Sequence, residues 1–501
     1  MSVNKARAFL EDILAHPDDD TPRLIFADWL EEEQGDSARA EFIRVQIERT
    51  RLPKWDARQV RLRLREKALI AQHGQKWREN LPRIKGVTWG EFRRGFVGKA
   101  TFSSFAVFQA NASACWAAAP LEAMSIRGPR RREAIASIAP LAGLRELSIE
   151  NSRMDGREVG QFADAPLLST LRTLNISNCH LGTEGFRRLV ASAHLRNLTA
   201  LRTPLNFIGN GGVSALFDAV ALDSLEELDL SEVGGYGRYG EDPIMEEVGL
   251  TALAGWPGMT RLRSLKLSGN DVGQGGVRAL LRSSRATGLK ELVLRENGFF
   301  GSAIQEFSAA HPELQLDVLD LGMNLLGNLG MAELASAPCL RELKVLELNR
   351  CEIELAGARR LANAPFLGSL RRLNVNENLF GPEGLHALLK KKPQELHTLL
   401  MGDNNLGDEG ISYLAKSPAS DTLMEVNLAW NELEDEAAET LAKSKHLRNL
   451  LILPLHNNPI STAALVALAE SPLGKRLAVP VVSPLGKHSA VPNADDEDIP
   501  F

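Results

Sequence analysis

Leucines recur along most of this chain in a pattern that is typical of short, one-sided strands. The pattern is L-x-x-L-x-L-x-x-N-x-L, and it is clear in LRSLKLSGNDV from Leu262, LKELVLRENGF from Leu289 and LRRLNVNENLF from Leu370. Alternating leucines turn one face of a strand inward, and the ninth residue can satisfy backbone groups in the bend that follows. Each copy therefore predicts one strand and one bend.

Copies of the pattern follow one another at a nearly constant interval. The spacing is 27 residues, apart from one interval of 37 and one of 26, which indicates a repeat fold. The opening residues are Leu144, Leu171, Leu198, Leu225, Leu262, Leu289, Leu316, Leu343, Leu370, Leu396, Leu423 and Leu450. Position nine is asparagine in most copies, and we expect Cys179 and Cys351, which occupy it in two others, to be structural.

The second half of each repeat has helical spacing. In GPEGLHALLKKKP from Gly381, the residues Leu385, Leu388 and Leu389 fall on one helix face. A strand and a helix in 27 residues resemble the ribonuclease-inhibitor-like class of leucine-rich repeats. The resemblance implies an α/β leucine-rich-repeat solenoid, a horseshoe with a concave parallel sheet and convex helices, made of about 12–13 repeats over residues 121–474.

Residues 1–120 lack the repeat and predict a small, mainly helical domain. Helices are expected from Lys5 to Ala15 and after Pro22. Candidate core residues of the second helix are Leu24, Ile25, Phe26, Trp29 and Leu30. The segment DTPRLIFADWLEEEQGDSARAEFIRVQIE resembles the bacterial repeat-companion domain, and HGQKWRENLP and FRRGFVGKATF fit the same family. This resemblance implies a bacterial repeat protein, but it implies no catalytic activity and no ligand.

Composition places the chain among ordinary folded proteins. Hydrophobic residues make up 44%, charged residues 24%, and the formal net charge is -6, so no global field favours nucleic acid or an anionic membrane. The four cysteines lie far apart, which favours a reducing compartment. No apolar run reaches signal-peptide or membrane-span length. We therefore expect a cytoplasmic protein.

No pattern along the chain predicts an enzyme, a cofactor site or a metal site. The cluster His16 to Asp20, HPDDD, has metal-ligand residue types, but aspartates before a proline more often form a turn and a helix start. Nucleotide-binding, hydrolase and zinc-protease signatures are not evident. The prediction is a protein without catalytic, cofactor-binding or metal-binding residues.

A basic stretch is the one feature that favours nucleic acid. Residues 49–99 hold fifteen Lys or Arg against four Asp or Glu. They could contact phosphates or an acidic partner. The alternative, which we prefer, is neutralisation by residues 1–48, where twelve acids face five bases.

Partner contacts are expected on the concave sheet, because positions five, seven and eight of each repeat should point to solvent. Trp430, at position eight, is the best candidate for a binding hot spot, although it could instead shield a sheet edge. Tyr236 and Tyr239 lie on the insertion that makes the 37-residue interval, which is either a recognition loop or a tolerated insertion. The other candidates are Arg202, Asp229, Lys266, Arg295, Asp320, Glu347, Arg350, Asn374 and Asn427.

These features together favour a non-enzymatic scaffold that binds a protein partner on the concave face. Alternatives are a regulatory module acting on an enzyme, such as a GTPase-activating protein, and, third, a nucleic-acid binder through residues 49–99. Residues 475–501 end in ADDEDIPF and predict a flexible acidic tail. The partner and the oligomeric state do not follow from the sequence.

Overall fold

The computed structural model describes residues 2–127, 141, 143–219, 221–232 and 245–478. It divides into two compact units, residues 1–272 and residues 273–501. The acidic tail expected at 475–501 lies outside the described residues from 479 onward, as does the insertion at 233–244.

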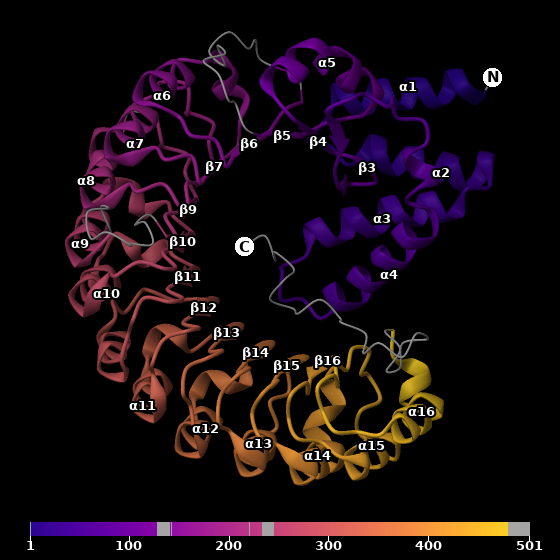
Figure 1. Cartoon of the computed structure of the whole chain (residues 1–501), viewed down its shortest axis with the longest axis vertical. Coiled ribbons are helices and arrows are strands. Elements are labelled where there is room, and N and C mark those ends of the chain that lie inside the picture. The colour runs from indigo at the N-terminus through magenta and orange to yellow at the C-terminus, as the bar shows by residue number, and fades with distance from the viewer. Residues whose placement is uncertain (1, 128–140, 142, 220, 233–244, 479–501) are drawn as a thin grey trace. The chain divides into compact units, whose positions relative to one another are not determined.

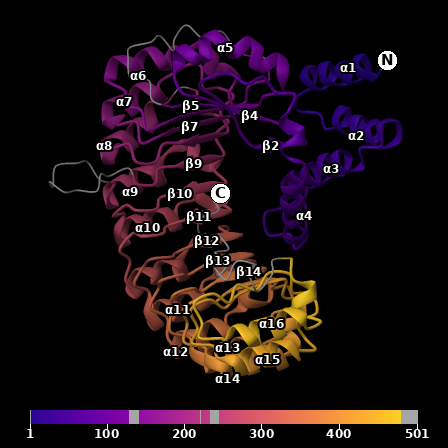
Figure 2. The same ribbon diagram turned by 45° about the vertical axis from the view of Figure 1, so that its right-hand side comes forward.

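The first unit opens with four helices, of which the first two lie where the sequence predicts helices. They are α1 (Ser2–Ala15), α2 (Thr21–Gln34), α3 (Ser37–Arg51) and α4 (Arg58–His73), and Figure 2 shows α2, α3 and α4 following one another. Phe26, Trp29 and Leu30 of α2 are buried in their core, but the expected core residue Ile25 is 50% exposed. Ile25 lies on the face of α2 that points to solvent and Phe26 lies on the buried face, which is why burial differs between these two adjacent apolar residues.

Strands follow these helices earlier than the sequence suggests. They are β1 (Val87–Trp89), β2 (Phe92–Arg93), β3 (Phe96–Val97) and β4 (Lys99–Phe102), and α5 (Phe105–Ala118) comes next. β2 and β3 form a small hairpin, whereas β4 pairs antiparallel with β1 and parallel with β5 (Ala123–Arg127). The sheet of the first unit thus begins at β1, ahead of the first leucine repeat. The sequence did not predict these strands, because residues 87–102 lack the leucine pattern.

From β4 to β10 the sheet of the first unit is parallel. Its later strands are β6 (Glu146–Glu150), β7 (Thr173–Ser177), β8 (Ala200–Arg202), β9 (Glu227–Asp229) and β10 (Ser264–Lys266). Helices α6 (Gly156–Ala163), α7 (Gly182–Val190), α8 (Gly209–Ser214) and α9 (Glu247–Gly255) alternate with them. One strand and one helix per repeat is the arrangement that the leucine spacing predicts.

The second unit repeats this arrangement. Its strands are β11 (Glu291–Val293), β12 (Val318–Asp320), β13 (Val345–Glu347), β14 (Arg372–Asn374), β15 (Thr398–Leu400) and β16 (Glu425–Asn427), all parallel. Its helices are α10 (Gly273–Arg282), α11 (Gly327–Ser336), α12 (Leu355–Ala362), α13 (Gly381–Lys390), α14 (Gly407–Lys416), α15 (Asp435–Ala442) and α16 (Thr462–Glu470). Figure 1 shows α11 to α15 along one side of strands β12 to β16. The repeat that opens at Leu289 differs, because its helix is a 3₁₀ helix, Gly301–Ala309.

Buried asparagines hold successive repeats of the second unit together. Asn378 at position nine accepts hydrogen bonds from the backbone of Cys351 and Ile353 in the preceding repeat, at 3.1 and 2.9 Å. Its Nδ2 donates to the carbonyls of Leu348 and Val375, at 2.9 and 3.0 Å. The side chain thereby provides hydrogen-bond partners for backbone groups that the short strands leave unpaired, which confirms the role expected for position nine.

Ion pairs join the helical region to the sheet within the first unit. Arg23 of α2 is almost fully buried and donates from Nη2 to Glu122 at 2.9 Å. Arg94 pairs with the same carboxylate. Glu122 directly precedes β5, so this contact fixes α2 and the β2–β3 hairpin against the start of the repeats.

Candidate partner-binding surface

Position five of the repeats forms continuous rows across each sheet. In the first unit the strand register places Arg202 next to Asp229 and Asp229 next to Lys266. In the second unit it aligns Asp320 with Glu347 and Glu347 with Asn374. The predicted site residues at this position therefore lie side by side on adjacent strands.

Most of these position-five side chains are less exposed than expected. Lys266, Asp320, Glu347 and Asn374 are at most 8% exposed, and Arg202, Asp229 and Asn427 are partly buried. Parallel strands lie about 4.8 Å apart, so side chains in one row cover one another. The expectation that position five points freely to solvent is wrong for the four buried residues.

Local hydrogen bonds occupy the acceptors at position five. The side-chain Oδ1 of Asp320, Asn374 and Asn427 accepts the backbone N–H two residues ahead, at 2.8, 3.0 and 3.0 Å. Asp229 does the same at 2.9 Å. Short acidic and amide side chains commonly hold a turn in this way. These four residues stabilise the end of their own strand.

An ion triad lies on the sheet of the first unit. Arg202 donates from Nε to Glu227 at 2.7 Å, and Nζ of Lys266 lies 3.4 Å from the same carboxylate. Burial by itself would raise the pKa of Glu227, but the hydrogen bond from Arg202 and the charge of Lys266 outweigh burial and lower this pKa below its ordinary 4.5. The candidates Arg202 and Lys266 are thus partners of a carboxylate that the sequence did not single out.

Position seven contains glycines that let side chains reach across a repeat. Arg295 donates from Nη1 to Asn349 Oδ1 at 2.8 Å, although the repeat of Gly322 lies between them. A Cβ on Gly322 would lie within 2.8 Å of Arg295 Nη1 and closer still to Asn349. Glu347 is paired in the same region, since it accepts from Arg372 Nε at 2.7 Å.

Position eight is where the chain leaves each strand, and it forms the exposed row of the second unit. Every residue at this position has a left-handed backbone, with φ between 50° and 65° in the two units. In the second unit the row consists of Glu296, Met323, Arg350, Glu377, Asp403, Trp430 and Asn457, which are exposed except for the partly buried Met323 and Glu377. We call these seven residues the position-eight row.

Two predicted residues, Arg350 and Trp430, belong to the position-eight row. The side chain of Arg350 is 54% exposed and pairs with Glu377, and Trp430 is 58% exposed at φ 58°. Glu377 and Asp403 were not among the residues predicted from the sequence. The recurrence of Asn, Asp and Gly before position nine was the available signal that this position has a special backbone, because these residues favour left-handed conformations.

The remaining predicted residues, Tyr236 and Tyr239, lie outside the described residues. Nothing in the structure bears on the recognition loop expected there.

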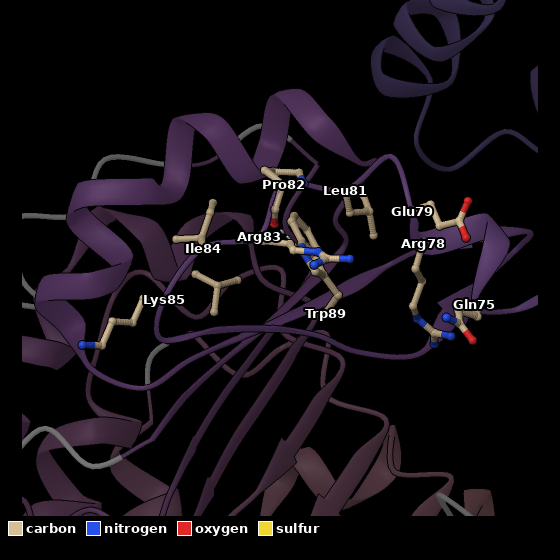
Figure 3. A pocket seen from close by; sticks show the side chains of 10 residues that line it. Gln75, Arg78, Glu79, Leu81, Pro82, Arg83, Ile84, Lys85 and Trp89 are labelled. Atoms are coloured by element: carbon tan, nitrogen blue, oxygen red, sulfur yellow. Dashed lines mark hydrogen bonds between the residues drawn. The ribbon is translucent and has the colours of Figure 1, made fainter.

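Acidic residues pair with much of the basic stretch at 49–99. Arg51 lies 2.7 Å from Asp20, Arg65 lies 2.6 Å from Glu41, and Arg49 pairs with Glu66. Asp20 and Glu41 belong to residues 1–48, so the pairs of Arg51 and Arg65 are the internal neutralisation that we preferred from the sequence, whereas Glu66 lies within the basic stretch itself. Arg78, Arg83 and Lys85 form no ion pair with any described residue, and they line a surface pocket between residues 75 and 89, which has a volume of about 550 Å³ (Figure 3).

The three aspartates of the cluster from His16 to Asp20 take part in ion pairs and backbone hydrogen bonds. Asp18 pairs with Arg172 at 2.9 Å, Asp19 accepts the N–H of Thr21 at 2.8 Å, and Asp20 pairs with Arg51. Among the described residues, no group of three or more His, Cys, Asp or Glu is placed to hold a metal ion.

Of the helices in the described part of the chain, none is long and apolar enough to span a membrane.

All four cysteines are free and buried. Burial raises the pKa of Cys179 to about 11 and that of Cys351 to about 12. Their thiols therefore stay protonated and poorly reactive at neutral pH. This agrees with the structural role expected for position nine.

Comparison with known proteins identifies the repeats. A family model described as Leucine Rich repeat matches residues 168–189, 259–281, 394–415 and 419–442. The chain therefore contains leucine-rich repeats. No curated protein matches it.

Solved structures resemble the chain only remotely. An internalin from Listeria monocytogenes is 18% identical, over 67% of this chain and 83% of that chain, with a TM-score of 0.39. A chain in the crystal structure of the Rad7 and Elc1 complex from yeast is 16% identical, over 69% of this chain and 78% of that chain, with a TM-score of 0.41. At these identities and TM-scores neither structure bears on function.

Proposed function

We propose that this leucine-rich-repeat protein is a non-enzymatic scaffold that binds a protein partner through the position-eight row of its second unit. Repeat arrays offer extended surfaces on rigid strands, and proteins of this kind use them for binding. The row contains an aromatic residue, an arginine, three acidic residues, a methionine and an asparagine. A protein surface fits this mixture better than a nucleic acid does, because phosphates require a stripe of positive charge.

Trp430 carries the proposal. A bulky side chain on left-handed backbone is disfavoured by roughly 1 kcal/mol relative to asparagine or glycine. Its ring is also more than half exposed, so folding recovers little of its apolar surface. The repeats need left-handed backbone at this position but not a tryptophan on it, whereas exposed tryptophans are typical anchors of protein interfaces.

The charged residues of the position-eight row suit the rim of such an interface. Arg350 and Glu377 satisfy each other at the surface, and Asp403 is exposed one repeat before Trp430. Rim charges set orientation and association rate, and a central aromatic residue supplies most of the affinity. Arg295, Asp320, Glu347, Asn374 and Asn427 would then support the row, and Arg202, Asp229 and Lys266 the sheet of the first unit.

We extend the proposal to the organisation and location of the chain. Residues 1–120 would form an N-terminal domain, residues 121–474 the repeat array, and residues 475–501 a tail. A cytoplasmic location is supported by the four unpaired cysteines.

Site-specific photocrosslinking tests the proposed surface. The photoreactive residue p-benzoylphenylalanine would replace Trp430 in one form of the protein and Val466 in the other. Val466 is also an exposed apolar residue of the second unit, but it lies on helix α16. In native extract we expect a discrete protein adduct from position 430 and none from position 466. Equal adducts, or none from position 430, would refute the proposed surface.

A further inference from the structure

The pocket at residues 75–89 of the first unit has a chemistry that the proposed scaffold function does not use. Leu81, Pro82, Ile84 and Val87 supply apolar lining, and Trp89 adds an aromatic ring. The charged lining residues are Arg78, Glu79, Arg83 and Lys85. Figure 3 shows these side chains arranged around the pocket. An apolar lining with a few charged groups is typical of a site for a specific ligand.

The three cations that line this pocket differ in their ion pairing from several arginines of the neighbouring helices. In the described part of the chain, Arg78, Arg83 and Lys85 make no salt bridge, whereas Arg49, Arg51 and Arg65 nearby each hold a carboxylate. Glu79 is the single acidic lining residue. Arg83 and Lys85 are exposed. Their charges therefore remain available to an anionic ligand.

Arg78 and Trp89 are held in place by hydrogen bonds to backbone carbonyls, and Arg78 also by an aromatic ring. Arg78 donates to the carbonyl of Gly90 at 3.1 Å, and its guanidinium carbon lies 4.2 Å from the ring centroid of Phe92. Burial lowers the pKa of Arg78, so a nearby anion would relieve an unfavourable environment. Trp89 donates from Nε1 to Pro82 at 3.0 Å, which fixes the indole at the wall. A ligand would therefore meet preorganised side chains at Arg78 and Trp89, which favours binding.

We propose that this pocket binds an acidic peptide segment of a protein partner, in which carboxylates meet Arg83 and Lys85 and an apolar side chain packs against Trp89. A nucleic acid fits less well, since it needs phosphate contacts along an extended cationic track, and Arg49 of α3 and Arg65 of α4 are already paired with carboxylates. The site lies in the first unit, so it does not depend on the position-eight row.

Fluorescence anisotropy with a defined probe tests this site. The probe is a short fluorescein-labelled peptide in which glutamate alternates with leucine, and the full chain is titrated against it. We expect Arg83→Glu/Lys85→Glu to weaken binding by about tenfold or more, because two attractive contacts become repulsive. The matched control is Arg61→Glu/Arg157→Glu, which reverses two exposed arginines away from the pocket and changes the net charge equally. Circular dichroism would check that both variants fold.

Each outcome decides the proposal. Loss of affinity in the pocket variant alone, together with no binding of a peptide in which glutamine replaces glutamate, supports it. Equal loss in both variants would show unspecific attraction and overturn it. No binding to the wild type, or binding of labelled oligothymidylate in place of the peptide, would overturn it as well. None of these results depends on Trp430, so failure here leaves the scaffold proposal standing.

Discussion

Arg295 reaches across a whole repeat of the second unit to donate a hydrogen bond to Asn349, at 2.8 Å. The contact exists because Gly322, which lies between them, has no side chain. Asn427 and Asn376 approach each other in the same way across Gly402, at 3.5 Å. Two of the predicted site residues, Arg295 and Asn427, thus brace the sheet over a glycine.

Gly322→Ala should lower the free energy of unfolding by about 1–3 kcal/mol, the usual range for overpacking a tight site. The new methyl group would displace Arg295 and Asn349 from each other. Urea denaturation followed by circular dichroism measures the change. Gly368→Ala is the control, because nothing lies within 4 Å of the added methyl group. Equal stability of the two variants would show that the Arg295–Asn349 contact adds nothing.

Asn378→Ala should destabilise the second unit by more than about 2 kcal/mol, because it leaves several buried backbone groups without partners. The groups are the N–H of Cys351 and Ile353 and the carbonyls of Leu348 and Val375. The same denaturation experiment applies, with the exposed Gln394→Ala as control. A variant as stable as the control would contradict the role assigned to position nine.

Glu122→Gln should weaken the attachment of α2 to the sheet by about 2 kcal/mol or more, since it strips a carboxylate from two arginines. Arg23 is almost fully buried and cannot turn to solvent. Hydrogen exchange should show faster opening of α2, and Glu32→Gln, at an exposed position, should leave exchange unchanged. Unaltered exchange in Glu122→Gln would mean that the helical region is held by other contacts.

The ion triad around Glu227 predicts how the stability of the protein depends on pH. The pKa of Glu227 is lowered in the folded protein, so the carboxylate contributes stability that is present above its ordinary pKa of 4.5 and is lost as pH falls through the lower folded value. The urea midpoint of the wild type should exceed that of Glu227→Gln at neutral pH, and the gap should shrink below about pH 4.5. Glu226→Gln, which changes an exposed neighbour, should show no such narrowing.

The sequence predicted the fold far better than the surface. The leucine interval placed strands β6 to β16, and position nine behaved as expected at Asn378. The start of the sheet at β1 was missed, because Val87–Trp89 pairs antiparallel and carries no leucine pattern.

The candidate site was predicted only in part, because exposure at a strand position depends on neighbouring strands. Asp320 and Glu347 alternate with inward leucines and read as surface residues, yet each is 5% exposed. Their burial comes from side chains 27 residues away along the chain, which are adjacent only once the strand register is known. Trp430, which lies where the chain leaves its strand, is exposed as the sequence predicts.

The affinity of the partner for the Trp430→Asn variant tests the central proposal most directly. The partner is the protein captured by the crosslinker at position 430, and isothermal titration calorimetry would compare the wild type with Trp430→Asn and Val466→Asn. Asparagine suits left-handed backbone, so we expect Trp430→Asn to fold normally while binding at least about thirtyfold more weakly, which corresponds to roughly 2 kcal/mol. Val466→Asn should bind like the wild type. Unchanged affinity of Trp430→Asn would contradict the assignment of the position-eight row as the binding surface.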